Sequence, residues 1–418
     1  MKNKRMLSGR MRSRLPDGFY SNGKWLTLLF QLLSMFLVLI LHIGQIDEKS
    51  VGFAVGLLVL TFLSASVVNR WMRGDRYLLL IVNLLFSIGV IMIFRIDAAL
   101  GLRQVMMYMI GVLFFFIVYL FLKKTNRFWA GKTLFFYLAA LSLFLITLVL
   151  GREIGGARNW ISIGGVLVQP SEFAKIPFVF YVASWFQNYE AHQKSLFGRW
   201  SLMAGTYLLI GLFFLQRELG TATVFFLVLL SSQIAYEKNW KLILLNIALA
   251  CAGMAVGYIL FAHVRVRFDL WLDPWQDIND KGYQIVQSLF GLAAGGFFGT
   301  GLGLGKPDTI PLGYSDFIFA SVVEEMGAFM GICVILLFLL LVYRGIKIAM
   351  NQERDFYSCL ALASAVLFAA QALIMFGGVM KVIPLTGITI PFMTAGGSSL
   401  LASFGLLAVL QVSSDQLE

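Results

Sequence analysis

The sequence predicts an all-α polytopic integral membrane protein with about twelve transmembrane helices and one large extracellular loop. Three observations predict this fold class. The 418 residues are 59% hydrophobic and 13% charged, whereas a soluble domain carries about 25% charged residues. Twelve apolar segments divide the chain, and most approach the ~20 residues that cross a hydrocarbon core. Lysine and arginine gather in alternate connections between these segments, as in chains that cross a membrane repeatedly.

The chain begins with a basic stretch and two apolar segments. Residues 1–24 hold seven Lys or Arg and one acid, Asp17, and we expect them to form a cytoplasmic tail. Residues 25–76 contain the first two predicted transmembrane helices, at 25–43 and 51–68. The first apolar run lacks a small-residue cleavage site, so no cleavable signal pattern is expected.

The other ten apolar segments form the predicted membrane core, residues 77–412, which a short cytoplasmic C-terminus at 413–418 follows. They lie at 77–94, 105–122, 134–150, 173–186, 202–215, 222–236, 242–264, 317–342, 356–376 and 389–412. The sixth, seventh and eighth of the twelve segments are short, so they require tilting, polar-ended extension or shelter by neighbouring helices.

The basic residues predict the orientation of the chain. With the N-terminus inside, 21 of the 33 Lys and Arg fall in the inner connections, which supports a cytoplasmic-membrane protein with both termini cytoplasmic. The outer connections are then 151–172, 216–221, 265–315 and 377–388, so the unusual polar stretches share one face. The net charge of +11 fits contact with anionic membrane lipid, and no nucleic-acid partner is expected.

The first outer stretch ends in a helix start. Ser171 reads as its cap and Glu172 lies in the first turn. Lys175 follows three residues later, so the two charges share a helix face and can pair. Two interpretations stay open: a capped helix with an internal ion pair, or a charged wall for a polar head group. Ionisable groups near hydrocarbon are costly, which modestly favours the second interpretation.

Two other outer stretches carry weaker signals. Arg217 and Glu218 end one helix and open the next, so a mutual ion pair is the expected arrangement. Pro384 and Pro391 break regular helix, and the small residues at 396–399 predict close helix packing.

Residues 282–327 are glycine-rich and polar at their centre, although apolar segments flank them. The alternating glycines at 299–305 do not fit G-x-G-x-x-G, and proline follows Lys306 where a phosphate-binding loop has Ser or Thr. Non-helical backbone at membrane depth lies against protein or a water-filled cavity, so we expect a cavity below this stretch. In a helix starting at Asp316, Glu324 would lie about 80° around the axis, where it could support Asp316 or form an ordinary helix-stabilising pair.

These stretches together resemble the SEDS family (shape, elongation, division and sporulation), the RodA/FtsW-type peptidoglycan glycosyltransferases. The resemblance covers residues 77 to about 412, and five motifs with the family's order and spacing carry it. They are QPSEFAK (169–175), GYQIVQS (282–288), GGFFGTGLGLGKP (295–307), DFIFASVVEEMG (316–327) and PLTGITIPFMTAGGSS (384–399). The two N-terminal segments precede the family's usual ten and resemble the extended N-terminus of some Gram-positive-type members.

The resemblance implies an enzyme that polymerises lipid II into glycan strands on the outer face, for cell shape, elongation or division. It also implies a class B penicillin-binding transpeptidase as partner. The family's catalytic aspartate corresponds to Asp316, and its QPSE…K acid and lysine correspond to Glu172 and Lys175. Four motifs depart from the family: Tyr314 replaces the histidine of HTDFIF, Arg217 and Glu218 replace the proline and aspartate of QPDLGT, and Arg158 stands one place early in G-A-x-R-W. In the fourth, SYGGSS, Thr394 and Ala395 replace the first two residues.

Sugar transfer from a polyprenyl diphosphate needs a base for the acceptor hydroxyl, but diphosphate leaves without a general acid. One aspartate, Asp316, is therefore sufficient in principle and contributes roughly 10²–10⁴-fold in rate, whereas a glycosidase needs two carboxylates. The diphosphate needs nearby positive charge from side chains or from a divalent cation, Mg²⁺ or Mn²⁺. The alternative function is a flippase of the lipid-linked precursor, although transporters place polar sites near the midplane. The candidate substrate-binding residues are Glu172, Lys175, Arg158, Lys306 and Glu324.

Overall fold

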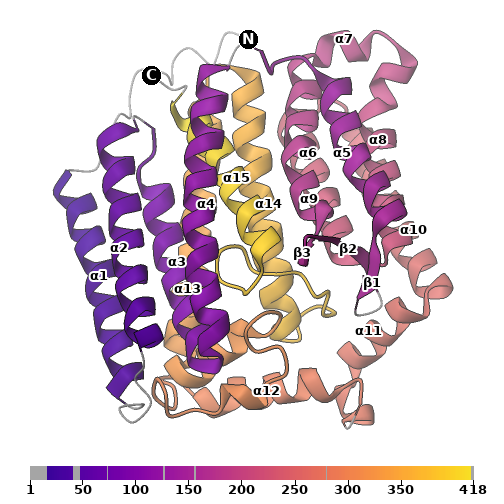
Figure 1. Cartoon of the computed structure of the whole chain (residues 1–418). Coiled ribbons are helices and arrows are strands. Elements are labelled where there is room, and N and C mark those ends of the chain that lie inside the picture. Colours follow the sequence, from indigo (N-terminus) through magenta and orange to yellow (C-terminus); the bar gives the residue numbers. More distant parts are fainter. Residues whose placement is uncertain are drawn as a thin grey trace.

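The computed structural model describes residues 17–40, 48–72, 74–125, 128–154, 157–278 and 280–415, which form a bundle of long helices (Figure 1). Most of the predicted cytoplasmic tail and the end of the predicted C-terminus lie outside these residues. The long helices are α1 (Asp17–Ile40), α2 (Glu48–Trp71), α3 (Tyr77–Ile96), α4 (Ala98–Lys124), α5 (Thr133–Leu150), α6 (Pro170–Gln187), α8 (Leu196–Gln216), α9 (Leu219–Tyr236), α10 (Trp240–Leu260), α13 (Ile318–Asn351), α14 (Asp355–Val379) and α15 (Gly397–Asp415). The shorter elements are strands β1 (Arg152–Ile154), β2 (Ala157–Ile163) and β3 (Val166–Val168), helices α7 (Tyr189–Gln193), α11 (Ala262–Leu272) and α12 (Tyr283–Gly295), and the 3₁₀ turns η3 (Pro274–Asp277) and η4 (Pro307–Thr309).

Eleven helices of the described chain are long and apolar enough to cross a membrane, so the protein is a multi-pass membrane protein as predicted. The remaining predicted segment, 173–186, which is the sixth along the chain, forms helix α6. This helix packs against α5, α9 and α14 (Figure 1). Helix α6 is not among the eleven apolar spans, and its first turns carry the charged Glu172 and Lys175. The predicted count of about twelve therefore becomes eleven apolar spans and one buried helix with a polar start.

Helix α1 begins and α15 ends at the same end of the bundle (Figure 1). Near the start of α1, the Tyr20 hydroxyl donates to Ala65 O of α2 at 2.8 Å. Between α2 and α3, the Asp75 N–H donates to Ser414 Oγ of α15 at 2.9 Å. The opposite end carries the three strands, α11, α12 and residues 380–396 (Figure 1). The predicted outer stretches are thus gathered at this one end, which we call the polar end, as the parity of the crossings requires.

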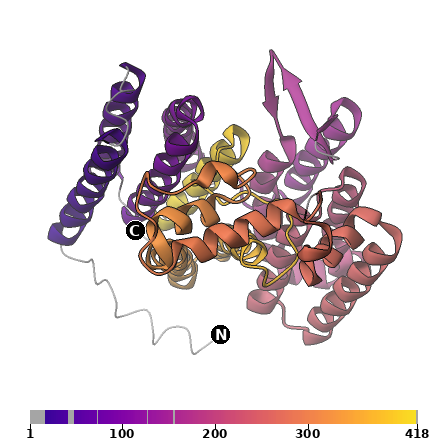
Figure 2. The ribbon, with the colours of Figure 1, turned by 90° about the horizontal axis from the view of Figure 1, so that it is seen from below.

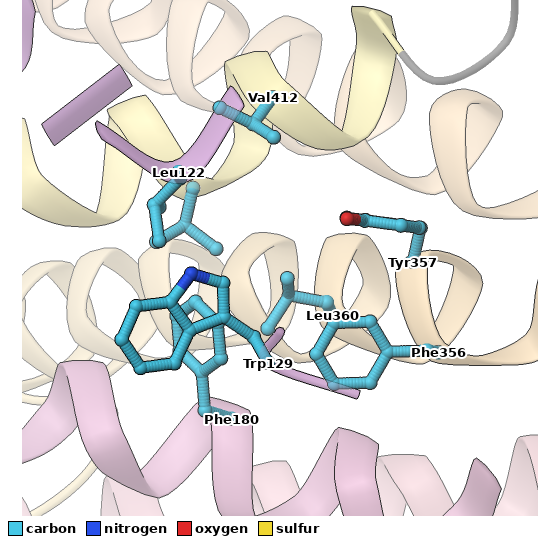
Figure 3. Close-up of a pocket in the computed structure, with 8 residues that line it drawn as sticks. Leu122, Trp129, Phe180, Phe356, Tyr357, Leu360 and Val412 are labelled. Atoms are coloured by element: carbon cyan, nitrogen blue, oxygen red, sulfur yellow. The ribbon is translucent and has the colours of Figure 1, made fainter. Parts of the chain in front are cut away.

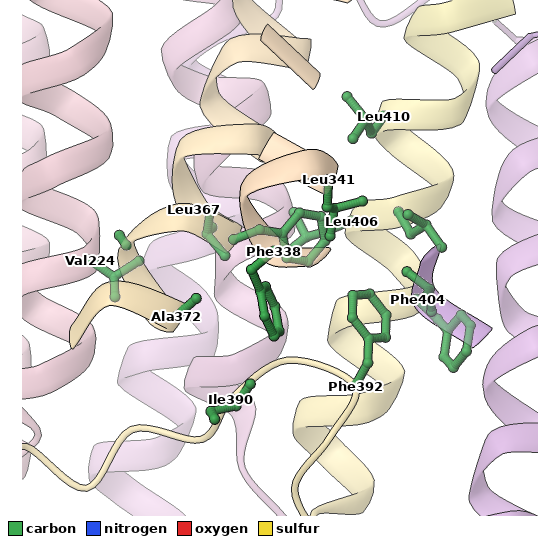
Figure 4. Close-up of a cluster of buried hydrophobic side chains, with 14 of the residues drawn as sticks. Val224, Phe338, Leu341, Leu367, Ala372, Ile390, Phe392, Phe404, Leu406 and Leu410 are labelled. Carbon is green, nitrogen blue, oxygen red and sulfur yellow. The ribbon is translucent and has the colours of Figure 1, made fainter. Parts of the chain in front are cut away.

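The centre of the bundle is built from α3, α14 and α15, which bury most of their residues. Figure 4 shows Phe338 of α13, Leu367 of α14, and Phe404 and Leu406 of α15 pointing into one apolar cluster. Small residues permit the close approach of these helices, because a Cβ on Gly345 of α13 would lie 2.6 Å from the Ala365 Cβ of α14. This tight centre supports the chain segments that lie across the polar end.

The structure departs from the predicted all-α description at the polar end. Strands β1, β2 and β3 form an antiparallel sheet in that order, and Gly164 and Gly165 have φ of 57° and 82° in the turn between β2 and β3. Two consecutive positive φ values are those of a two-residue hairpin turn. Figure 2 shows the strands extending from the edge of the bundle and α12 lying across its end. The predicted loop 265–315 is therefore largely ordered into α11, α12 and two 3₁₀ turns.

The last predicted segment, 389–412, begins later than expected. Helix α15 starts at Gly397, and residues 381–396 have no regular helix. Pro384 and Pro391 fall in this irregular segment, as expected from the missing N–H and fixed φ of proline. The segment lies at the polar end, where it reaches the residues described next (Figure 1).

Candidate functional site

Asp316 lies in the turn directly before α13, which begins at Ile318, two residues after the helix start considered from the sequence. The Phe317 N–H still donates to Leu312 O at 3.2 Å, so the chain turns back here before α13 begins. The Ser321 hydroxyl of α13 donates to Gly313 O at 3.0 Å and fixes the turn to the helix. Asp316 is half-buried, and within the described part of the chain no hydrogen bond or ion pair engages its carboxylate.

The cation that faces Asp316 is Arg267 of α11. Its Nη1 donates to Leu385 O at 3.0 Å, which fixes the guanidinium against residues 381–396. A Cβ on Gly387 would lie 3.6 Å from Asp316 Oδ2 and 4.0 Å from Arg267 Nη2, so both groups border the same space. Burial raises the pKa of Asp316, and the positive charge of Arg267 opposes this by lowering it.

Sequence reasoning missed Arg267, because no spacing relates α11 to a turn so much later in the chain. The available signal was its position. Arg265 and Arg267 follow an apolar segment directly and lie on the predicted outer face, where positive-inside bias makes basic residues scarce.

The glycine-rich stretch joins its backbone to a break in α13. Gly327 interrupts this helix with φ of 79°. The Thr300 N–H donates to Glu324 O at 2.9 Å, and the Ala328 N–H donates to Gly296 O at 2.9 Å. A Cβ on Gly299 would lie 2.2 Å from backbone oxygen, so only glycine permits this approach.

The carboxylates of Glu324 and Glu325 hold this stretch in place. Glu324 Oε1 accepts the Lys306 N–H at 2.9 Å. Glu325 Oε2 accepts the Gly303 N–H at 2.8 Å, and its Oε1 lies 3.3 Å from Arg95 Nε. The sequence leaves two roles open for Glu324, support of Asp316 or a helix-stabilising pair, and its described carboxylate contact is instead with the backbone of the glycine-rich stretch. Its support of Asp316 and its part in substrate binding stay predictions. The Lys306 side chain itself is exposed.

A second polar cluster surrounds the start of α6. Lys175 Nζ lies 2.6 Å from Glu172 Oε1, and their side chains are 1% and 7% exposed, so the predicted pair exists and is buried. Glu172 Oε2 is buried without a hydrogen-bond donor among the described residues. The charges of Glu172 and Lys175 both act on Glu218, so these three groups form one cluster, which we call the Glu172 cluster.

Glu218 turns toward this cluster and not toward Arg217. The predicted Arg217–Glu218 pair is wrong, because Arg217 Nη1 lies 3.3 Å from Glu153 Oε1. Burial raises the pKa of Glu218, and a hydrogen bond from Thr221 opposes this shift. The predicted cap Ser171 lies inside the first turn of α6 instead, and its hydroxyl donates to Glu218. The donors to Glu218 are Asn159 Nδ2 (3.3 Å), Gln169 Nε2 (3.0 Å), Ser171 Oγ (3.0 Å) and Thr221 Oγ1 (2.6 Å).

Residues 386–388 lie between the two clusters. A Cβ on Gly220, two residues after Glu218, would lie 2.4 Å from an Ile388 side-chain carbon and 3.1 Å from Thr386 Cβ. Gly387, between these two, borders Asp316. The structure therefore brings Asp316 and the Glu172 cluster to opposite sides of one short segment.

Arg158 lies outside both clusters in the described structure. It is exposed on β2 opposite Glu153, and its Nε donates to Gly151 O at 2.9 Å. Its neighbour Asn159 reaches the second cluster through Glu218, and the predicted contact of Arg158 with a head group stays a prediction.

An apolar pocket is lined by residues of α4, α6, α14 and α15, among them Leu122 and Phe356, together with Trp129 (Figure 3). Among the described residues, no three His, Cys, Asp or Glu side chains come together to hold a metal ion.

The chain is similar to known proteins over most of its length. The model of the FtsW/RodA/SpoVE family, described as cell cycle protein, matches residues 75–417. The chain is 34% identical over 363 residues to the peptidoglycan glycosyltransferase RodA of Mycobacterium tuberculosis, covering 80% of this chain and 77% of the relative. It is 32% identical over 359 residues to the stage V sporulation protein E of Bacillus subtilis, covering 80% and 95%.

Solved structures show the same architecture. One, described as structural coordination of polymerization and crosslinking by a peptidoglycan synthase complex, gives a TM-score of 0.70 at 28% identity and covers 83% of this chain and 99% of that one. The rod shape determining protein RodA of Thermus thermophilus gives a TM-score of 0.61 at 25% identity, with 83% and 99% covered.

Proposed function

Because the chain belongs to the FtsW/RodA/SpoVE family, we propose that it is a peptidoglycan glycosyltransferase that polymerises lipid II into glycan strands. One observation carries the mechanism. The Asp316 carboxylate is half-buried, has no hydrogen-bond donor among the described residues, and borders the same position beside Gly387 as the Arg267 guanidinium. A carboxylate in this state is available to accept a proton.

Asp316 acts as the general base. Its carboxylate accepts the proton of the acceptor hydroxyl, whose oxygen forms a bond to the anomeric carbon of the donor sugar. The bond between that carbon and the diphosphate oxygen breaks, and polyprenyl diphosphate leaves with the electron pair. Proton transfer to a positioned base of this kind contributes roughly 10²–10⁴-fold. No general acid is required, which agrees with a single carboxylate at the turn.

The second cluster binds the polar head group of the substrate. Lys175 supplies positive charge toward the diphosphate, and Glu172 Oε2 offers a buried acceptor without a partner among the described residues. We propose a divalent cation, Mg²⁺ or Mn²⁺, only because the substrate carries a diphosphate. The described residues offer no ligand set of three such side chains, so no step is routed through a metal.

The site faces outward from the cytoplasmic membrane, and both termini are cytoplasmic. The excess of Lys and Arg at the end where α1 begins and α15 ends supports this orientation. We also propose a class B penicillin-binding transpeptidase as partner. Its support is the likeness to a complex described as coordinating polymerization and crosslinking.

Replacement of Asp316 tests the function directly. Asp316→Asn keeps the shape and much of the hydrogen bonding of the turn but cannot accept the proton. With purified protein and lipid II, we expect at least a hundredfold loss of glycan polymerisation, while the variant still folds. The matched control is Asp308→Asn, since Asp308 is an exposed aspartate of η4 in the same stretch, and it should stay within twofold of the unmodified protein. Near-normal polymerisation by Asp316→Asn would refute the mechanism.

A further inference from the structure

We propose that Arg267 is a positioning residue for Asp316, and that it keeps the carboxylate in the ionised form that accepts the proton. This inference rests on the proposed function, because it assigns a role to Arg267 only if Asp316 is the base.

Helix α11 is tied to residues 381–396 along its length. Arg267 Nη1 donates to Leu385 O at 3.0 Å. One turn further, Trp271 Nε1 donates to Lys381 O at 3.1 Å, and Lys381 Nζ returns a bond to Leu272 O at 3.3 Å. These contacts fix the helix and its arginine relative to Gly387. The guanidinium therefore faces Asp316 without needing a direct bond to it.

Asp316 and Arg267 border one position beside Gly387. Gly387 has φ of 70°, and the position that its Cβ would take is within 4 Å of only two described heavy atoms beyond its chain neighbours. These atoms are Asp316 Oδ2 and Arg267 Nη2. No ion pair closer than 4.0 Å joins the two groups in the described structure, so they border a notch where one substrate oxygen can lie between them. We name this space, bounded by Asp316, Arg267 and Gly387, the Gly387 notch.

The other charged groups near this turn have partners elsewhere. From α13, Glu324 and Glu325 bind the backbone of the glycine-rich stretch. From residues 381–396, Lys381 binds Leu272 O. On α11 itself, Arg265 donates to Ile259 O and its side chain is exposed. Lys306 and Asp269 are exposed. Arg267 is thus the cation that acts on Asp316 among the described residues.

The direction of the effect follows from the charges. Burial raises the pKa of Asp316 and Arg267 lowers it. A general base works only when ionised, so activity falls as pH drops through its pKa. Removing the positive charge raises that pKa further, and the acidic limb of the pH–rate profile then moves to higher pH. A purely structural role for Arg267 would lower the rate at every pH and leave the limb in place.

Arginine suits this position better than lysine. The guanidinium presents separate N–H donors, so Nη1 binds Leu385 O while Nη2 faces the Gly387 notch. A lysine ammonium supplies the charge but cannot hold both positions with one planar group. Arg267→Lys should therefore restore part of the effect that Arg267→Gln removes.

The test measures kcat/KM for lipid II polymerisation from pH 5 to 9 in four variants. We expect Arg267→Gln to move the acidic limb upward by about one pH unit, the size expected for removal of a nearby opposite charge. Arg267→Lys should give a smaller shift in the same direction. The matched control Arg265→Gln, two residues earlier on the same helix, should leave the limb unchanged.

An unchanged limb in both Arg267 variants overturns the inference, and so does an equal shift in Arg265→Gln. If Arg267→Gln does not fold, Arg267→Met, which also removes the charge, takes its place, and an unchanged limb in it overturns the inference. Asp316→Asn is measured in parallel. Its near-normal activity would refute the proposed base itself, whereas an inactive Asp316→Asn with an unmoved limb in the Arg267 variants would refute only the role of Arg267.

Discussion

Glu172 and Lys175 show how a buried charge pair can serve stability and function at once. Both side chains are buried and their charged atoms lie 2.6 Å apart. Two charges removed from water are costly, and their attraction offsets that cost only while both are present. The same pair lies beside Glu218. Burial raises the pKa of Glu218, the charge of Glu172 raises it further, and the charge of Lys175 lowers it.

We expect a difference between single and double replacements of this pair. Lys175→Met alone leaves Glu172 buried without its partner and should lower the free energy of unfolding by about 3–5 kcal/mol. Glu172→Gln combined with Lys175→Met removes both charges and should recover most of that stability. Polymerisation should not recover, because the double variant lacks the proposed head-group contacts. Thermal unfolding in detergent and polymerisation of lipid II are the two measurements. A double variant with normal activity would show that the pair is only structural.

At the residue scale, local signals predicted local contacts and failed over distance. The spacing of Glu172 and Lys175 predicted their pair, because three residues bring side chains onto one helix face. Arg217 and Glu218 misled because a helix end separates them: Arg217 has φ of 60°, which turns the two side chains apart. Arg267 could not be paired with Asp316 from the sequence, since only the tertiary fold brings α11 to that turn.

At the element scale, the two N-terminal helices are joined to the core by buried hydrogen bonds. Gln31 of α1 donates to Ser87 of α3 at 2.6 Å and to Thr61 of α2 at 3.0 Å. Asn83 of α3 donates to Thr61 O at 3.0 Å, which adds a bond between α2 and α3. At its other end, Arg95 of α3 holds the glycine-rich stretch. Helices α1 and α2 therefore support a helix that reaches the polar end.

Gln31→Leu tests this connection. It removes the Gln31 side-chain bonds to α2 and α3 and puts an apolar side chain of similar length in their place. Hydrogen bonds between membrane helices contribute about 0.6 kcal/mol on average and at most about 1.7 kcal/mol, so we expect a fall of a few degrees in Tm in detergent. Leu33→Ala, at an exposed position of α1, is the control and should change Tm less. An unchanged Tm in Gln31→Leu would show that the network does not stabilise the docking.

Some helix boundaries have a signal in the sequence. Asp97 marks the boundary between α3 and α4, because it follows α3 and its side chain caps α4 through the Ala99 and Leu100 N–H groups. The pair Gly164-Gly165 between β-branched residues signals a hairpin, yet in an apolar chain it was read as part of an outer loop. The break at Gly327 was not predicted, because the surrounding residues favour a continuous helix.

At the scale of the whole molecule, all the proposed chemistry lies at one end of the bundle. Asp316, Arg267 and the Glu172 cluster lie at that end, where residues 386–388 separate them. The charge bias predicted this sidedness, because each crossing alternates the face of the next connection. The charge bias could not predict the regular structure within the outer loop 265–315, because tertiary contacts stabilise its short helices and no apolar periodicity marks them.

The orientation in the membrane can be tested at two exposed positions that lie at opposite ends of the bundle. Asp280 lies between η3 and α12 at the polar end, and Lys347 lies near the end of α13 at the other. Cys251, Cys333 and Cys359 are first replaced, and a single cysteine is then introduced at either position. The connections that hold 21 of the 33 basic residues are expected to face the cytoplasm. An impermeant thiol reagent applied to intact cells should therefore label Asp280→Cys strongly. It should label Lys347→Cys only after the cells are opened. Labelling of Lys347→Cys alone in intact cells would reverse the orientation. It would also place Asp316 on the cytoplasmic face, away from the growing glycan.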